Sequence, residues 1–190
     1  MKMAIKAGLV IGVFSAAGAF AADGAGTVQR DVNQQERIEQ GLKSGELNTR
    51  EAARLEHQEA AVDHLQAKAL KDGDLTPAER ARINAAQNQV SRDIYRQKHD
   101  AQTGNPNSAS SQRMQADVQR NANQEARIDQ GLRSGSLSAQ EAARLEHGQA
   151  HVERKEARAG ADGHVGGIEQ RGIQRSENRN SRRIHRNKHN

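Results

Sequence analysis

The stretch QGLKSGELNTREAARLEH, residues 40–57, returns as QGLRSGSLSAQEAARLEH at residues 130–147. The offset of 90 residues holds without gaps to the end of the chain, where SRDIYRQKH at 91–99 meets SRRIHRNKH at 181–189. Self-similarity over this length indicates two copies of one structural unit. We therefore predict two tandem units, residues 34–100 and 124–190.

The apolar residues of each unit predict three helices, because they recur at spacings of three, four and seven. Glycine follows the first two helical patterns, where a helix end favours a left-handed residue. The motifs Asn48-x-x-Glu51 and Thr76-Pro77-x-Glu79 then match helix N-caps with a capping-box glutamate. The fold class predicted is all-α, with two tandem three-helix units joined by a flexible linker. The expected helices of unit one cover residues 34–43, 49–70 and 77–98.

Two segments lie outside these units. Residues 101–123 are polar and rich in Asn, Ser and Gln, which predicts a disordered linker, and residues 22–33 are expected to be a similar flexible leader. Unit two is expected to be less well packed than unit one, because it loses large apolar residues. The replacements are Leu65 by Lys155, Leu70 by Gly160, Pro77 by Gly167 and Val90 by Asn180.

The N-terminus carries the pattern of an export signal. Lys2 and Lys6 precede an apolar run over residues 7–20, and Ala19-Phe20-Ala21 fits a signal peptidase site. The apolar run is shorter than the roughly 20 residues that span a bilayer, which argues against an uncleaved anchor. We predict a signal peptide over residues 1–21 and export to the periplasm, with secretion as an alternative.

The composition argues against an enzyme. Aromatic residues make up 2% of the chain, and there is no cysteine. Absence of cysteine excludes disulfides, thiolate metal sites and cysteine nucleophiles. The sequence has no GxSxG or HExxH motif, and so few large side chains predict a thin core without an aromatic-lined pocket. We expect a non-enzymatic protein with no catalytic residues.

The turns between helices resemble the second half of an EF-hand loop. Gly73, Leu75 and Glu79 take the places of the loop glycine, the apolar residue and the final glutamate. Calcium binding here would use Asp72, Asp74 and Glu79, but Lys68 and Leu70 stand where the first carboxylates belong. Helix capping by the same residues is the simpler alternative.

Histidines offer a second candidate metal site. His147 and His151 are four residues apart on a predicted helix, so they share one face and could bind Zn, Cu or Ni. Solvated surface histidines are the alternative.

The C-terminal stretch is strongly basic, with Arg182, Arg183, Arg186 and Lys188 close together. No aromatic residues accompany this charge for base stacking, and an exported protein rarely meets nucleic acid, so nucleic acid is not an expected partner. An anionic envelope surface or an acidic partner suits the patch better, and a solvated helix face is the plain alternative.

The repeats resemble those of a group of uncharacterised small exported proteins of proteobacteria. The matching motifs are SGxLxxxEAxxLE at 44–56, DGxLTxxE at 72–79 and SRxIxRxKH at 91–99. This resemblance implies an envelope location and a helical fold, without an activity. The leading functional hypothesis is a non-enzymatic envelope protein that acts through helix surfaces, on a protein partner or on itself. The alternative is a periplasmic metal-binding or metal-buffering protein that uses the histidine pairs or the EF-hand-like loops.

Overall fold

The computed structural model describes residues 17–189, with side chains described from residue 24 onward. The expected signal segment over residues 1–21 lies almost entirely outside this part. The described chain forms six helices and no strand, which confirms the all-α prediction. None of these helices is long and apolar enough to cross a membrane. The helices are α1 Ala17–Ser44, α2 Thr49–Ala69, α3 Pro77–Lys98, α4 Ala109–Ser134, α5 Ala139–Ala159 and α6 Gly167–Lys188.

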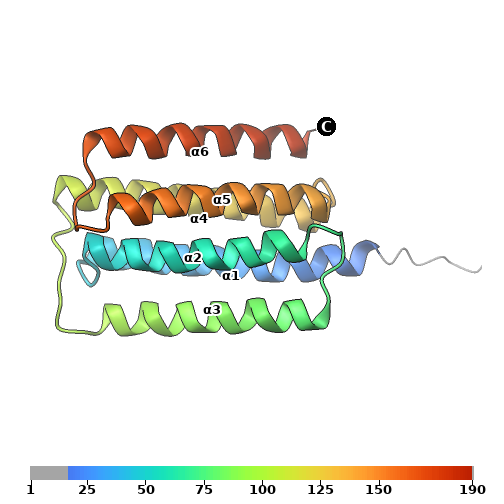
Figure 1. The fold of residues 1–190 in the computed structure, drawn as a ribbon, viewed down its shortest axis with the longest axis horizontal. Helices are drawn as coiled ribbons and strands as arrows, with labels where there is room; N and C mark the ends of the chain where they lie inside the picture. Colours follow the sequence, from blue (N-terminus) through green and yellow to red (C-terminus); the bar gives the residue numbers. More distant parts are fainter. Residues whose placement is uncertain (1–16, 190) are drawn as a thin grey trace, which may run out of the picture.

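The six helices lie side by side as a flat bundle (Figure 1). Helices α1, α2, α4 and α5 form a central four-helix group, and α3 and α6 lie on its two outer sides. The most extensive interfaces join the units, since α1 packs along α4 and α2 packs along α5. Leu55, Met114 and Val152 accordingly belong to one apolar cluster. The two repeats therefore share a core.

Helix starts follow the capping chemistry expected from the sequence. Asn48 and Thr76 each accept a hydrogen bond from the backbone N–H of a glutamate three residues later, and that glutamate bonds back to the cap. Ser138 repeats this capping box at the start of α5. The first turn of each unit uses a glycine in the left-handed region, Gly45 at φ 80° and Gly135 at φ 72°, which a residue with a Cβ rarely adopts.

Both segments expected to be flexible are largely helical, so that prediction was wrong. Residues 22–33 belong to α1, and residues 109–123 belong to α4, which begins after the N-cap Ser108. Val28 and Val118 are fully buried, at equivalent positions of the two repeats. Apolar residues are sparse in these segments, but they occur at helical spacing, and packing of α1 along α4 stabilises them.

The apolar losses in unit two have local replacements. Lys155 donates from Nζ to Ser176 Oγ at 2.7 Å, and Asn180 donates to the side chain of Gln149. Gly160 lies against the side chains of Ala53 and Met114, where unit one has Leu70. Weaker packing of unit two, read out as lower hydrogen-exchange protection, stays a prediction.

Restoring leucine at position 160 should destabilise the protein, although leucine is the residue of the other repeat. A Cβ there would lie 2.7 Å from Ala53 Cβ and Met114 Cε, so the added side chain has no space. We expect Gly160→Leu to lower the free energy of unfolding by about 2–3 kcal/mol. The control is Gly172→Ala in α6, where an added Cβ meets open space. This change should raise the free energy of unfolding by up to about 1 kcal/mol, because alanine favours the helix more than glycine does. Chemical denaturation measures both, and a stabilised Gly160→Leu protein would contradict this packing.

Candidate functional site

The core of the four-helix group is acidic. Fully buried carboxyl groups come from α1, α2, α4 and α5, and no Lys, Arg or His is buried in the part of the chain that the structure describes. An isolated carboxylate is costly to bury, so each one needs a hydrogen-bond donor, a proton or a cation. The carboxyl groups of these four helices with at most 2% exposure are those of Asp31, Glu51, Glu56, Glu59, Asp63, Asp117, Glu125, Glu146, Glu153 and Glu156.

Amide side chains satisfy several of these carboxylates. Gln66 of α2 donates to Asp31 of α1 at 2.5 Å, and Asn121 of α4 donates to Glu156 of α5 at 2.7 Å. Positions 31 and 121 are equivalent in the repeat, and so are 66 and 156. The two repeats thus make the same contact with donor and acceptor exchanged.

A further amide joins two carboxylates across the interface between the units. Gln35 Nε2 donates to Glu56 Oε2 at 3.2 Å and to Glu153 Oε1 at 2.9 Å. We call Gln35, Glu56 and Glu153 the amide cluster. Its three members come from α1, α2 and α5.

The repeat places a second cluster at the equivalent positions, without an amide. Asp63, Glu125 and Glu146 correspond to Glu153, Gln35 and Glu56, and we call them the carboxylate cluster. One oxygen from each carboxyl group lies within 4.8 Å of the others, and all three residues are buried. None of the six oxygens has a hydrogen-bond partner. Glu125 therefore occupies the position at which the amide cluster has its hydrogen-bond donor, Gln35.

Burial and mutual repulsion act together on the carboxylate cluster. Burial raises the pKa of Glu125 well above its usual range, and the charges of Asp63 and Asp31 raise it further. Burial also raises the pKa of Glu146, with the charge of Glu125 as the next cause. The side chain of Gln149 acts in the opposite direction and lowers the pKa of Glu125. The cluster can therefore be neutral only by taking up protons or a cation.

Glu59 is a further unpartnered carboxylate of α2. It lies one helical turn before Asp63 on α2, is fully buried, and has no hydrogen-bond partner for either oxygen. Burial raises its pKa, and so do the charges of Asp31, Glu56, Asp63 and Glu125. Glu59 is thus a further buried acid that needs a proton or a cation.

The EF-hand-like turn lies apart from this cluster and serves as a helix cap. Glu79 Oε2 accepts from the backbone N of Thr76 at 3.0 Å and from its Oγ1 at 2.6 Å. Asp72 and Asp74 are exposed. The carboxylate that would close a calcium loop is already engaged in the capping box, and calcium binding by these residues stays a prediction from sequence.

Removing this cap tests its role. We expect Glu79→Ala to destabilise the protein by about 1 kcal/mol, because the start of α3 loses its reciprocal hydrogen bonds. Calcium affinity, measured by calorimetry, should be unchanged. A calcium affinity that falls more than tenfold in this variant would instead favour the loop as the calcium site.

The predicted pair His147 and His151 lines a small hollow with Ser176, Arg179 and Arg183. Burial lowers the pKa of His151, and the charges of Lys155, Arg154 and Arg179 lower it further. The same positive charges oppose a cation at this place. The fold also brings His64 of α2 near His147, with ring centroids 6.4 Å apart, a juxtaposition not predicted from the sequence.

Three of the four basic C-terminal residues, Arg182, Arg183 and Arg186, are exposed on α6. Arg183 also lines two hollows beside α5. Lys188 Nζ donates to Gln130 Oε1 of α4 at 2.9 Å and helps to hold the end of α6. Binding of an anionic surface by these four residues stays a prediction.

Sequence reasoning missed the carboxylate cluster, although a signal was present. In α2, Glu56, Glu59, Asp63 and Gln66 follow helical spacing beside the apolar stripe, and α5 repeats this pattern of acids and amides 90 residues later. A polar face kept in both repeats beside the core could have indicated a buried polar interface. No family model, curated protein or solved structure matches the chain.

Proposed function

We propose that this chain is an exported, non-enzymatic protein that binds a hard divalent cation, calcium foremost, in its four-helix core. The observation that carries the proposal is the carboxylate cluster, where six buried oxygens have no hydrogen-bond donor. The expected role is metal binding or buffering by the carboxylate cluster. The sequence had pointed instead to the histidine pair and the EF-hand-like turn.

The geometry supports a cation of calcium size. Because the three oxygens lie within 4.8 Å of one another, an ion between them would lie no more than about 2.8 Å from each. Calcium bonds to oxygen at about 2.3–2.6 Å, which small side-chain movements would reach. Three carboxylates offer up to six oxygens, in line with the roughly six to eight that calcium takes.

The donor set favours hard cations over transition metals. Every candidate ligand atom is a carboxylate oxygen, the type preferred by calcium, magnesium and manganese, whereas zinc and copper favour nitrogen and sulfur. Magnesium dehydrates reluctantly, so a buried site without room for its waters disfavours it. We therefore expect calcium to bind more tightly than magnesium, with manganese between them.

A calcium titration of the purified protein tests this function. Calorimetry at pH 7.5 should give one site per chain and release of protons, because binding displaces protons held by the cluster. Calcium at about 100 times its Kd should raise Tm by about 5–10 °C. Glu125→Gln should lose this binding, and the matched Glu36→Gln, at an exposed position of α1, should keep it. Equal calcium binding in both variants, or none in the parent protein, would contradict the proposal.

A further inference from the structure

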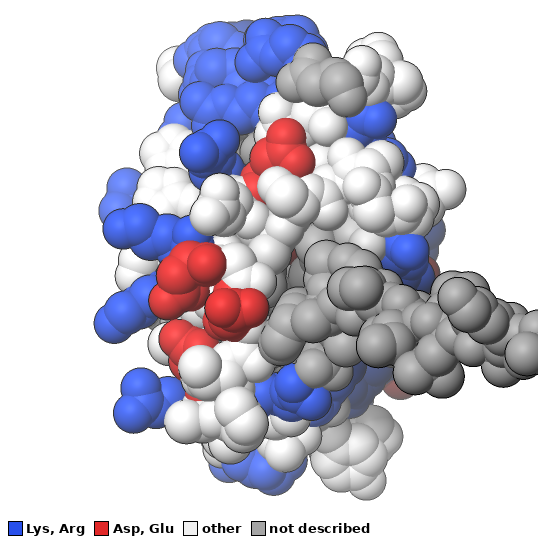
Figure 2. All heavy atoms as spheres, turned by 90° about the vertical axis from the view of Figure 1, so that its right-hand side faces the viewer, with Lys and Arg blue, Asp and Glu red and all other residues white. Residues whose placement is uncertain are grey.

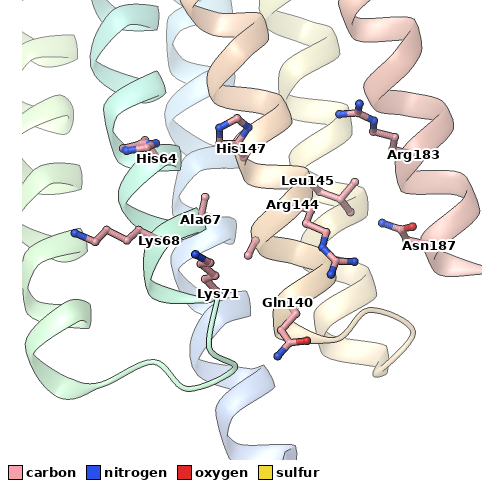
Figure 3. Close-up of a pocket in the computed structure, with 11 residues that line it drawn as sticks. His64, Ala67, Lys68, Lys71, Gln140, Arg144, Leu145, His147, Arg183 and Asn187 are labelled. Carbon is pink, nitrogen blue, oxygen red and sulfur yellow. The ribbon is translucent and has the colours of Figure 1, made fainter.

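A second candidate binding site lies on the surface where α2, α5 and α6 meet. It is a hollow of about 920 Å³ lined by eleven residues (Figure 3). His64 and Lys68 of α2, Lys71 of the turn after it, and Arg144 and His147 of α5 are among these residues, and the ammonium end of Lys68 points toward α3. This volume falls within the range of pockets that hold small ligands.

The lining combines positive charge with an apolar floor. Lys68, Lys71, Arg144 and Arg183 contribute four full charges, and no carboxylate lines the hollow. Ala67, Ala143 and Leu145 are buried beneath them. Lys and Arg side chains also gather over α6 at the top of the face seen in Figure 2. An anion attached to a hydrocarbon body would match both the rim and the floor.

The repeat supplies an internal comparison for this surface. The positions equivalent to Arg144 and Gln140 are Arg54 and Arg50, at the opposite end of the bundle. There residues 102–105 and 108 of the connection between the units line a hollow together with both arginines. Gly104 donates its backbone N–H to Gly45 O at 2.8 Å and holds this connection in place.

The two copies also differ in charge. The residue equivalent to Arg183 is Asp93, which pairs with Arg96 of its own helix. The other copy also carries four cations, Arg50, Arg54, Arg154 and Arg158, and it differs by the Asp93 carboxylate and by the connection beside it. Of the two equivalent surfaces, the hollow between α2, α5 and α6 is therefore the one that combines basic side chains with no carboxylate.

We propose that this hollow binds an amphiphilic phosphate, in which a phosphate mono- or diester adjoins an acyl chain or similar apolar body. Lys71 and Arg144 would contact the phosphate oxygens, since Arg and Lys are the usual phosphate-binding residues, and Lys68 and Arg183 would add positive charge around them. The apolar part would lie over Ala67, Ala143 and Leu145. This site lies on the surface and does not depend on the cation site in the core.

The experiment measures binding of three probes in the presence of a calcium chelator. They are vesicles of phosphatidylglycerol, a short-chain phosphatidylglycerol below its micelle concentration, and inorganic phosphate. We expect saturable one-to-one binding of the short-chain lipid, with inorganic phosphate at least tenfold weaker because it lacks the apolar body. Binding of vesicles but not of the short-chain lipid would overturn the pocket in favour of diffuse membrane attraction. Equal affinity for inorganic phosphate would overturn the amphiphilic ligand.

Matched variants locate the site. Lys71→Gln with Arg144→Gln should weaken short-chain lipid binding at least tenfold. The control is Arg158→Gln with Arg54→Gln, which removes the same charge from the other repeat and should change affinity less than twofold. Equal weakening of lipid binding by both pairs of substitutions would overturn the proposal. Unchanged helicity and Tm of the variants would show that they remain folded. The Glu125→Gln protein should bind the lipid like the parent, which separates this test from that of the cation site.

Discussion

The calcium-free Glu125→Gln protein is expected to be more stable than the parent, with Tm raised by about 4–8 °C at pH 7.5. The substitution converts the carboxylate cluster into a copy of the amide cluster, where Gln35 donates to two carboxylates. It removes one buried acid and supplies hydrogen-bond donors to Asp63 and Glu146. We expect these changes to raise the free energy of unfolding by about 2 kcal/mol. The same change should abolish calcium binding. A more stable protein that no longer binds its ligand is the signature of a site, since functional groups are often held at a cost to stability.

The reciprocal change serves as its control. Gln35→Glu would place a third acid in the amide cluster and remove the donor shared by Glu56 and Glu153. Without calcium, we expect the free energy of unfolding to fall by about 3–5 kcal/mol, because buried charges are left unpaired. Millimolar calcium should restore much of this loss by occupying a second, created site. Thermal unfolding with chelator and with calcium measures both changes, and a Gln35→Glu protein as stable as the parent would contradict the donor role.

Stability should fall as pH rises from about 5 to 8, the reverse of the usual behaviour of paired carboxylates. Burial raises the pKa of Asp117 to about 8, with the charge of Glu177 as the next cause, and burial raises the pKa of Glu177 to about 7. The folded state thus holds protons that the unfolded state, with carboxyl pKa values near 4, has released. Their stabilising effect is complete below about pH 4 and is lost as pH rises through about 7–8.

Each such group contributes up to about 1.4 kcal/mol per pH unit in that window. Asp31 and Glu56, each with a pKa raised by burial to about 7, act in the same direction. With calcium removed, we expect Tm at pH 5 to exceed Tm at pH 8 by at least about 10 °C. Asp117→Asn with Glu177→Gln should flatten this slope. A Tm that rises between pH 5 and pH 8 would contradict the buried state of these acids.

The helices and their caps could be predicted because their signals are local. The capping boxes at Asn48 and Thr76 and the left-handed Gly45 depend on residues a few positions apart, and the structure has them where expected. The helical character of residues 109–123 was missed because it depends on Met114 and Val118 packing against another unit. Composition alone made this segment look like a linker.

The candidate site could not be predicted for a related reason. Asp63 and Glu146 look like surface acids on amphipathic helices, and only the packing of α2 along α5 turns them inward. The formal charge of +5 also conceals an acidic interior beneath a basic surface. The internal repeat carried the missing information, since comparing position 35 with position 125 shows where an amide has become an acid.

Anomalous diffraction from crystals grown with manganese, in parallel with calcium, tests the proposed cation site in the core. We expect one peak within about 2.8 Å of a carboxylate oxygen from each of Asp63, Glu125 and Glu146, and calcium at the same position. Glu125→Gln crystals should lack that peak. Peaks confined to exposed carboxylates, with Asp63, Glu125 and Glu146 bonded to one another through shared protons, would contradict it.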